Sequence, residues 1–276
     1  MVLAAGRGER MRPLTDTCPK PLLQVRGQPL LQYPLRALHT AGVSATVINT
    51  GWLGDQIEPA FGPYFSTDAM PNTPDAAPMA LYYSHEGRGA GEALETAGGI
   101  VRALPLLDEV FWVAAGDVYV PGFEFSAQAF DRFKHSPQLA HIWLVPNPAH
   151  NPGGDFGLSA DGLALNLPKA ASSSVTSPAA PHSYVSNASS TEAHDPIQVP
   201  GQLYTFSTIA LYKKTFFSEA RCGIPPGNPQ GVKTPLAPLL RRAMDEGLVT
   251  ASLYNGLWVD VGTPERLAQL NERPFA

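Results

Sequence analysis

Residues 1–21, MVLAAGRGERMRPLTDTCPKP, decide more about this chain than any other stretch. A short apolar run, Met1–Ala5, leads directly into Gly6-Arg7-Gly8, as at the end of a buried strand. Glycines let the backbone approach a ligand and turn its N–H groups toward it. Three side chains that follow, Arg10, Arg12 and Lys20, add positive charge. Bare N–H groups and cations at the end of a strand predict a site for a polyphosphate.

The composition of the whole chain is that of a mildly acidic globular protein, in contrast to this positive stretch. The chain has 276 residues, enough for one large domain or two small ones, and 44% of them are hydrophobic. The formal net charge of −5 disfavours non-specific binding of nucleic acid. We therefore expect a local positive patch that binds a small anionic ligand, without a nucleic-acid partner.

Several other sites and locations are disfavoured by the sequence. The two cysteines, Cys18 and Cys222, make neither a disulfide framework nor a zinc pattern, and the seven histidines are scattered. Charges begin at Arg7, with no apolar run before them that is long enough for a signal peptide, so none is predicted. No stretch approaches the roughly 20 apolar residues of a membrane span. We expect a cytoplasmic protein with no membrane partner, whose first strand, clipped at Met1, begins upstream in the natural chain.

Apolar runs alternate with helix-like segments, which predicts an α/β fold with a doubly wound, mostly parallel mixed sheet in a single domain. In such sheets a ligand lies beyond the carboxyl ends of the strands. The glycine-rich turn follows the first strand and should therefore lie at that edge. The expected strands are Met1–Ala5, Thr46–Thr50, Ala80–Ser84, Val110–Ala115 and His141–Pro146, and the expected helices include Pro29–Ala41 and Gly91–Leu104.

Two segments interrupt the alternation. Residues 61–78 carry prolines, glycines and polar residues and predict a surface loop. Residues 168–200 are rich in Ser, Ala, Thr and Pro, which predicts a flexible insertion within the one domain of residues 1–276. No hexapeptide series follows Asp260, so no β-helical tail is expected.

Two apolar runs carry an aspartate at or near their end. One is FWVAAGD, ending at Asp117, and the other is WVDVGT, which contains Asp260. Carboxylates from two strands could share one Mg²⁺, which prefers carboxylate and phosphate oxygens. The structural alternatives are a plain Gly-Asp turn and a helix cap before residues 264–270, although Thr263 is the better cap.

The whole string LAAGRGERMRPLT…PKPLL, residues 3–23, resembles the signature of sugar-1-phosphate nucleotidyltransferases. A Rossmann fingerprint would need glycine in place of Met11, and no Gly-Lys-Ser/Thr of a Walker A loop is present. The resemblance covers residues 1–58, 79–167 and 201–270. It implies a Rossmann-like nucleotidyltransferase fold and an enzyme that joins a sugar 1-phosphate to a nucleoside triphosphate with release of pyrophosphate.

The resemblance implies roles for the N-terminal residues. In the family the loop wraps the triphosphate, the arginine matching Arg10 stabilises the departing pyrophosphate, and the lysine matching Lys20 holds phosphate oxygens. Nucleotidyl transfer builds charge on these oxygens, and preorganised cations offset it. A solvated surface lysine is the structural alternative for Lys20, but the prolines on both sides fix its backbone. The implied nucleotide-binding residues are Leu3, Ala4, Ala5, Gly6, Arg7, Gly8, Glu92 and Gly98.

The same resemblance implies the remaining sites. Asp117 and Asp260 match the family's metal-binding pair, with Mg²⁺ as the cofactor. The segment from Glu92 to Gly99 resembles the glycine-bearing helix start that family members place near the nucleotide base. The structural alternative is an ordinary helix start, whose two acidic side chains interact favourably with the helix dipole. The sugar-side candidates, each equally open to a structural explanation, are Asp155, Thr205 and Lys233.

Within the family, several segments resemble the branch that transfers UMP to N-acetylmuramic acid 1-phosphate in peptidoglycan recycling. They are GWLGDQI (residues 51–57), EALET (92–96), GDF (154–156), TFS (205–207) and a compact C-terminal part that ends at VDVGT (259–263). Many other members carry Glu-Lys-Pro near the middle of the chain, and Leu167-Pro168-Lys169 does not match it. This absence disfavours the guanylyl and thymidylyl branches.

Three alternatives remain open at this stage. Mannose-1-phosphate guanylyltransferases and glucose-1-phosphate thymidylyltransferases share every phosphate motif, and the choice of base and sugar depends on a few hydrogen bonds. A glycosyltransferase would need Asp-x-Asp, where this chain has Asp117-Val118-Tyr119. A non-catalytic nucleotide-sensing subunit would be expected to have lost Lys20 or an aspartate. The sequence allows a monomer or a small homo-oligomer.

Overall fold

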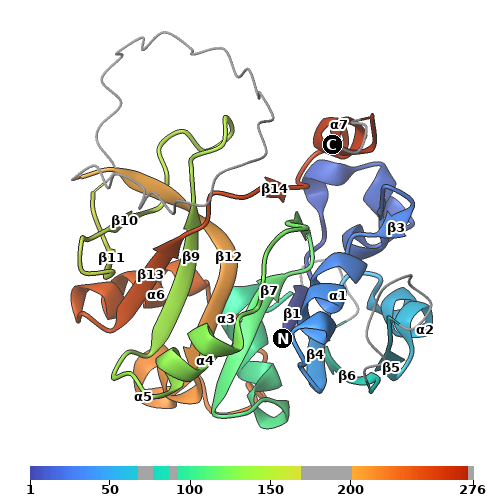
Figure 1. Ribbon diagram of the computed structural model, residues 1–276. Coiled ribbons are helices and arrows are strands. Elements are labelled where there is room, and N and C mark those ends of the chain that lie inside the picture. The colour runs from blue at the N-terminus through green and yellow to red at the C-terminus, as the bar shows by residue number, and fades with distance from the viewer. Residues whose placement is uncertain (68–76, 88–92, 169–200, 273–276) are drawn as a thin grey trace, which may run out of the picture.

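The computed structural model describes residues 1–67, 77–87, 93–168 and 201–272, in which strands and helices alternate (Figure 1). The strands are β1 (Val2–Ala4), β2 (Gln24–Val25), β3 (Gln28–Pro29), β4 (Ala45–Thr50), β5 (Tyr64–Phe65), β6 (Met79–His85), β7 (Val110–Ala115), β8 (Val118–Tyr119), β9 (Ala140–Val145), β10 (Phe156–Leu158), β11 (Ala164–Leu165), β12 (Leu203–Lys213), β13 (Val249–Leu253) and β14 (Val259–Asp260). The helices are α1 (Gln32–Thr40), α2 (Ile57–Phe61), α3 (Glu95–Ala103), α4 (Ala127–Lys134), α5 (Glu219–Cys222), α6 (Leu236–Asp245) and α7 (Pro264–Glu272).

Ten of the described strands form one mixed sheet in the order β11-β10-β12-β7-β1-β4-β6-β5, with β9 and β13 continuing from β12. The other four form two short pairs, β2 with β3 and β8 with β14. Its centre is parallel: β1 pairs with both β4 and β7, and β4 pairs with β6. The long strand β12 runs antiparallel to β7 and β9. All five apolar runs predicted as strands are present, within one residue of their predicted bounds, and the doubly wound, mostly parallel sheet is confirmed.

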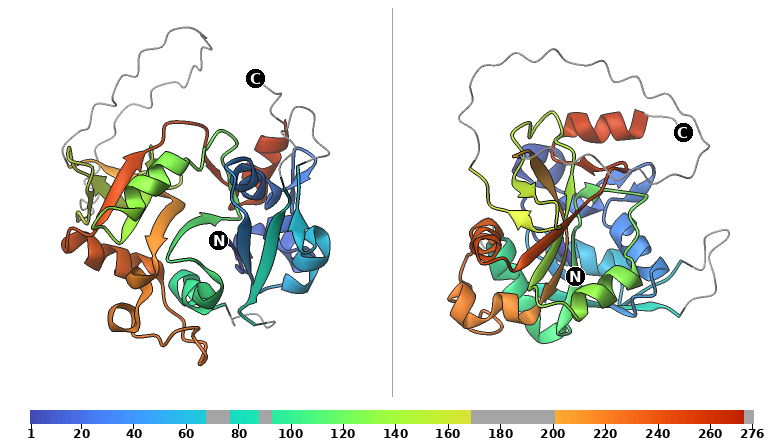
Figure 2. Two further views of the ribbon diagram at one scale, coloured as in Figure 1. Left: turned by 60° about the horizontal axis from the view of Figure 1, so that its bottom comes forward. Right: turned by 60° about the vertical axis from the view of Figure 1, so that its left-hand side comes forward.

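Helices cover both faces of this sheet because its central strands are apolar on both sides (Figure 2). Phe111 and Val113 of β7 belong to the core beneath α3 and α6. The alternate residues, Trp112 and Ala114, point to the opposite face and belong to the core beneath α1 and α4. Successive side chains of a strand alternate between faces, so one run of residues supplies two separate cores.

The helix starts and one predicted loop differ from expectation. α1 begins at Gln32 rather than Pro29, because residues 28–29 pair with residues 24–25 as a short hairpin. α3 begins at Glu95, four residues later than predicted. The predicted surface loop at 61–78 includes strand β5, which pairs with β6. The predicted insertion at 168–200 lies outside the described residues except for its first residue.

A third, smaller core ties the C-terminal helix to the N-terminal segment. Met11, Val25 and Leu30 pack with Leu267 and Leu270 of α7. The backbone N–H of Arg26 donates to Asn271 Oδ1, and Asn271 donates to the carbonyl of Gln24. Residues near the two ends of the sequence therefore lie side by side at the top of Figure 1. Among the described helices, none has both the length and the apolar character needed to cross a bilayer.

Acid is expected to weaken this fold through His141 of β9. Its ring lies 2.9 Å from Thr250 Oγ1 and 3.2 Å from Ser252 Oγ, and burial, with a contribution from Arg132, lowers its pKa to about 4. An unfolded histidine titrates near pH 6.5, so between these values the unfolded chain binds a proton that the native protein excludes. The stabilisation is complete above pH 6.5 and is lost as the pH falls toward 4.

Urea unfolding at pH 7 and pH 4.5 tests this expectation. We expect His141→Gln to reduce the difference in unfolding free energy between the two pH values by about 2 kcal/mol. His135, an exposed histidine at the end of α4, supplies the matched control, His135→Gln. Equal pH dependence in wild type and His141→Gln would contradict the assignment.

Candidate functional site

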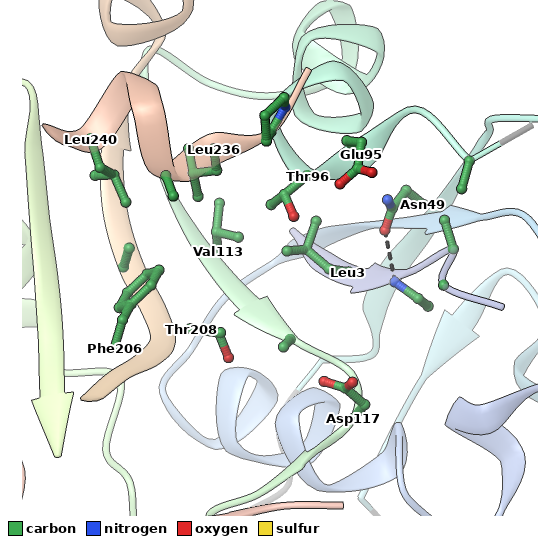
Figure 3. A pocket seen from close by; sticks show the side chains of 18 of the residues that line it. Leu3, Asn49, Glu95, Thr96, Val113, Asp117, Phe206, Thr208, Leu236 and Leu240 are labelled. Carbon is green, nitrogen blue, oxygen red and sulfur yellow. Dashed lines mark hydrogen bonds between the residues drawn. The ribbon is translucent and has the colours of Figure 1, made fainter. Parts of the chain in front are cut away.

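A cavity of about 720 Å³ opens beside the carboxyl ends of the parallel strands. This volume lies in the usual range for small-molecule sites. Figure 3 shows Phe206 and Leu240 on one side of it, and Glu95 and Asn49 on the other. Asp117 lies at a third point of the wall. The predicted residues Leu3, Ala4, Ala5 and Gly6 of the first strand and turn also line this cavity.

The glycine-rich loop folds back over the lysine that the sequence singled out. Gly8 has a left-handed backbone with φ of 67°. A Cβ at Gly8 would lie 3.0 Å from the Thr15 methyl group and 3.3 Å from the Lys20 Cβ, so only glycine fits without displacement. The Thr15 hydroxyl donates to the Gly8 carbonyl at 2.9 Å. The loop is thereby closed onto Lys20 before any ligand binds.

The side chain of Arg7, which was predicted to bind nucleotide, instead contacts other residues of this loop and holds it in place. Its guanidinium donates to the Thr15 carbonyl at 2.8 Å and to Asp16 Oδ1 at 2.9 Å. It also lies over the Trp52 ring, 3.9 Å from the ring centre. The hydrogen bond from Arg7 lowers the pKa of Asp16. A contact of residue 7 with nucleotide would therefore come from its backbone rather than from its charge.

Lys20 joins the two aspartates that were predicted to share a metal ion. Its Nζ lies 2.6 Å from Asp117 Oδ2 and 4.0 Å from Asp260 Oδ1. The Lys20 side chain is only 9% exposed, so it is no solvated surface lysine. Three predicted residues that are far apart in the sequence thus converge at the edge of the cavity.

Backbone pairing and a neighbouring arginine hold Asp260 in this place. Strands β8 and β14 pair so that Asp260 lies opposite Val118, and the Val261 N–H donates to the Asp117 carbonyl. Arg266 Nη1 donates to Asp260 Oδ2 at 2.8 Å and to the Asp260 carbonyl at 2.9 Å. Sequence reasoning missed Arg266, because its role depends on the turn between β14 and α7. The residue that caps helix α7 is Thr263 and not Asp260, because Thr263 Oγ1 accepts a hydrogen bond from the Arg266 N–H at 3.4 Å.

The donor set suits a magnesium ion that is shared with a substrate. Among the described residues, no group of three or more His, Cys, Asp or Glu side chains could hold a metal by itself. Asp117 and Asp260 nevertheless approach the same cation, Lys20 Nζ, within 4.0 Å. Mg²⁺ is commonly held by one or two carboxylates together with substrate phosphates. The pair therefore fits a divalent ion that arrives with a polyphosphate.

Arg10 is the uncommitted cation of the loop. It is exposed in the short turn Glu9–Met11 and makes no hydrogen bond or ion pair with any residue that the structure describes. Its charge reaches His150, whose pKa is lowered chiefly by burial, next by Arg266, and to a smaller degree by Arg10. His150 in turn lies 3.5 Å from Asp260. As an exposed cation with no such partner among the described residues, Arg10 is available for an anion.

A buried polar network supports the opposite side of the cavity. Glu86 accepts hydrogen bonds from Asn49 Nδ2 at 2.5 Å and from the Leu94 N–H at 2.8 Å. Asn49 in turn accepts from the Ala4 N–H at 2.8 Å. Burial raises the pKa of Glu86 although these hydrogen bonds oppose the rise. The network joins β1, β4 and the start of α3. A polar residue inside an apolar strand, Asn49, was the sequence signal for it.

Of two further residues predicted to bind nucleotide, the structure describes one, Gly98, and it has a packing role. Gly98 lies within α3, and its N–H donates to the Thr234 carbonyl. A Cβ there would lie 2.5 Å from the Val232 carbonyl, so Gly98 allows α3 to pack against the segment before α6. Glu92 falls outside the described residues.

The three residues predicted to bind the sugar phosphate differ in whether they line the cavity. Asp155 lines the cavity, and its Oδ2 accepts from the Phe206 N–H at 3.0 Å and from Asn151 at 3.1 Å. Thr205 does not line it, because its hydroxyl donates to Asn147 Oδ1 at 2.9 Å. Lys233 is exposed just before α6 and lies outside the cavity wall. Of these three residues, the structure brings only Asp155 to the cavity.

Backbone strain is present at two positions of the cavity wall. Glu95 has φ of 61° and Thr208 has φ of 64°, and both side chains line the cavity (Figure 3). Left-handed backbone is unfavourable for most residues with a side chain, especially for a β-branched one. Thr208 lies where the register of β12 against β9 shifts between Phe206 and Ala210. Such strain is concentrated at functional sites.

We expect Thr208→Gly to stabilise the protein while lowering its activity. Glycine removes the left-handed strain, which costs about 1–3 kcal/mol, although it loses more backbone entropy on folding. The unfolding free energy measured in urea should therefore rise by about 1 kcal/mol. Thr208→Ala keeps the strain, so it should not rise. A glycine variant that is no more stable than the alanine variant would show that the backbone here is unstrained.

The sequence of the chain is similar to those of known proteins. Residues 1–152 match the MobA-like NTP transferase domain. The N-acetylmuramate alpha-1-phosphate uridylyltransferase of Neisseria meningitidis serogroup B is 40% identical over 272 residues, covering 98% of this chain and 95% of the relative. The enzyme of the same name from Caulobacter vibrioides is 33% identical over 169 residues, covering 59% of this chain and 65% of the relative.

A solved structure shares the whole fold. It comes from Bacillus anthracis, is assigned as a glucose-1-phosphate thymidylyltransferase, and contains a sucrose molecule. It superposes with a TM-score of 0.64 at 17% identity and covers 100% of this chain and 96% of its own. At this identity the likeness concerns the fold alone.

Proposed function

The chain belongs to the MobA-like NTP transferase family and is a sugar-1-phosphate nucleotidyltransferase, and from this premise we propose that it joins UTP to N-acetylmuramic acid 1-phosphate. The products are the UDP-sugar and pyrophosphate, and the process served is peptidoglycan recycling in the cytoplasm. The relatives from Neisseria and Caulobacter, both N-acetylmuramate alpha-1-phosphate uridylyltransferases, support the choice of substrates.

One observation carries the proposal: Lys20 Nζ lies 2.6 Å from Asp117 and 4.0 Å from Asp260 at the edge of the cavity that the glycine turn lines. The sugar phosphate would attack the α-phosphorus of the nucleotide in line with the departing pyrophosphate. Its oxygen is already ionised, so no residue needs to act as a general base. Catalysis then consists of positioning and charge neutralisation.

Each cationic residue has a separate part in this chemistry. The N–H groups of the glycine turn meet the triphosphate. Lys20 turns from Asp117 toward a non-bridging oxygen at the reacting phosphorus, and Arg10, which has no protein partner among the described residues, meets the departing pyrophosphate. Asp117 and Asp260 would hold Mg²⁺, which when bound would neutralise charge on phosphate oxygens. Arg266 keeps Asp260 in position through its 2.8 Å hydrogen bond.

A matrix of substrates tests the proposal. Pyrophosphate release is measured with UTP, GTP, dTTP and CTP, each against the 1-phosphates of N-acetylmuramic acid, N-acetylglucosamine, mannose and glucose. We expect the highest kcat/KM for UTP with the muramic acid derivative. A preference for GTP with mannose 1-phosphate, or for dTTP with glucose 1-phosphate, would replace the proposed substrates within the same family. No release with any pair would identify a non-catalytic member.

A further inference from the structure

One face of helix α6 forms part of the cavity wall and ends in an arginine. Leu236, Ala237, Leu240 and Arg241 line the cavity. These positions are spaced by one, three and four residues, as on one side of a helix. The three apolar members leave Arg241 as the charged group on this wall. Its neighbour in the sequence, Leu240, lies with Phe206 on one side of the cavity in Figure 3, away from Asn49 and Glu95.

The guanidinium of Arg241 is held in a defined orientation. Nη1 donates to Asn166 Oδ1 at 2.7 Å, and Nη2 donates to the Asp155 carbonyl at 3.3 Å. The guanidinium carbon lies over the Phe156 ring, 5.0 Å from its centre. Asn166 is itself fixed by two hydrogen bonds to Asp245. A long side chain held in this way loses little further freedom when it binds a ligand.

The charge of Arg241 has no direct counterion in the part of the chain that the structure describes. Both partners of its guanidinium are neutral oxygens, an amide and a carbonyl. The next residue, Arg242, is exposed and lies 4.0 Å from Glu246. A guanidinium has five N–H donors, and Arg241 uses two in these hydrogen bonds. It therefore offers both positive charge and unused donors at the cavity wall.

We propose that Arg241 binds a carboxylate on the sugar and so selects an acidic hexosamine 1-phosphate. This inference rests on the proposed function, because N-acetylmuramic acid differs from N-acetylglucosamine by a lactyl ether that ends in a carboxylate. Guanidinium and carboxylate match in charge and in paired hydrogen-bond geometry. The aromatic rings of Phe156 and Phe206, 6.2 Å apart, form an apolar neighbourhood that suits the lactyl methyl group and strengthens the ion pair.

The test compares N-acetylmuramic acid 1-phosphate with its lactyl amide, which has nearly the same shape and no charge at that end. With UTP, the wild type should prefer the acid, and Arg241→Gln should lose this preference. We expect KM for the acid to rise by roughly 10–100-fold in the variant, as for the loss of a hydrogen bond to a charged group. The KM for the amide should change by about twofold at most. Arg241→Lys should recover part of the preference, since it keeps the charge without the paired donors.

Arg242→Gln is the matched control and should behave as wild type with both sugars. The amide reaction also reports that Arg241→Gln is folded. Equal losses with acid and amide would overturn the inference, because Arg241 would then act on the phosphate or on the fold. An unchanged preference in the variant would overturn it as well. A wild type that does not prefer the acid to the amide would overturn this inference alone, because the proposed function is decided separately by the matrix of nucleotides and sugar 1-phosphates.

Discussion

Lys20→Ala is expected to lower kcat/KM for nucleotidyl transfer by about 10³-fold, the effect of removing one preorganised charge from an oxyanion site. The Lys20 ammonium is nearly buried and lies between two carboxylates. It is therefore held at the site before the substrates arrive, and once it has turned from Asp117 toward the bound α-phosphate it needs no further reorganisation when charge develops there. Pyrophosphate release under saturating and limiting substrate measures both kcat and KM, and the loss should appear mainly in kcat.

The same variant should remain folded. Asp117 is 38% exposed, so its charge stays hydrated when Lys20 is removed, and we expect the unfolding free energy to change by about 1 kcal/mol or less. Lys214→Ala is the control: Lys214 lies 3.7 Å from the exposed Glu109, and its removal should leave turnover unchanged. Near wild-type turnover in folded Lys20→Ala would refute the role of Lys20.

Much of the fold was predictable because its signals are local. The runs at residues 46–50 and 110–115 are apolar and bounded by turns, and each forms a strand within one residue of its predicted bounds. The start of α1 was not, because Gln28 and Pro29 follow the pairing of a hairpin rather than their helical neighbours. A short hairpin with the preceding residues therefore overrode the helical pattern at this end of α1, and the ends of elements are where sequence patterns fix least.

The site could be predicted as far as its residues carry a sequence motif. Lys20 and Asp117 belong to motifs, and the structure brings them together with Asp260. Arg266 and Arg241 carry no motif, because each acts through contacts that form only when the chain has folded. Arg266 reaches back over one turn to Asp260, whereas Arg241 meets Asn166 across 75 residues of sequence. Such positions emerge from tertiary structure alone.

The geometry also explains why two arginines of the motif, Arg7 and Arg10, have different roles. Arg7 and Arg10 are equally suited to phosphate by charge, but Arg7 is bound to Thr15 and Asp16 and lies over Trp52. Rigidity of the loop requires one guanidinium, and the other remains exposed. Substitution of Arg7 should therefore lower stability as well as activity, whereas substitution of Arg10 should lower activity alone.

Asp117→Asn and Asp260→Asn are each expected to lower kcat by about 10²–10³-fold, and the double variant should lose little more than the worse single variant. Side chains that act as one unit show such non-additivity, and these two lie around one ammonium on adjoining strands. Both single variants should need higher Mg²⁺ concentrations for half-maximal pyrophosphate release, since each keeps only one carboxylate of the pair.

Asp161→Asn, an exposed aspartate in the turn between β10 and β11, is the control and should match wild type in turnover and in Mg²⁺ dependence. The size of the double-variant effect decides between two arrangements. If the losses multiplied, to about 10⁴–10⁶-fold, each carboxylate would serve a separate step. If Mg²⁺ titrations were unchanged while kcat fell, the aspartates would act by orienting Lys20 and Arg266 rather than by holding a divalent ion. A shared loss together with a shifted Mg²⁺ requirement is the one combination that a common ion explains.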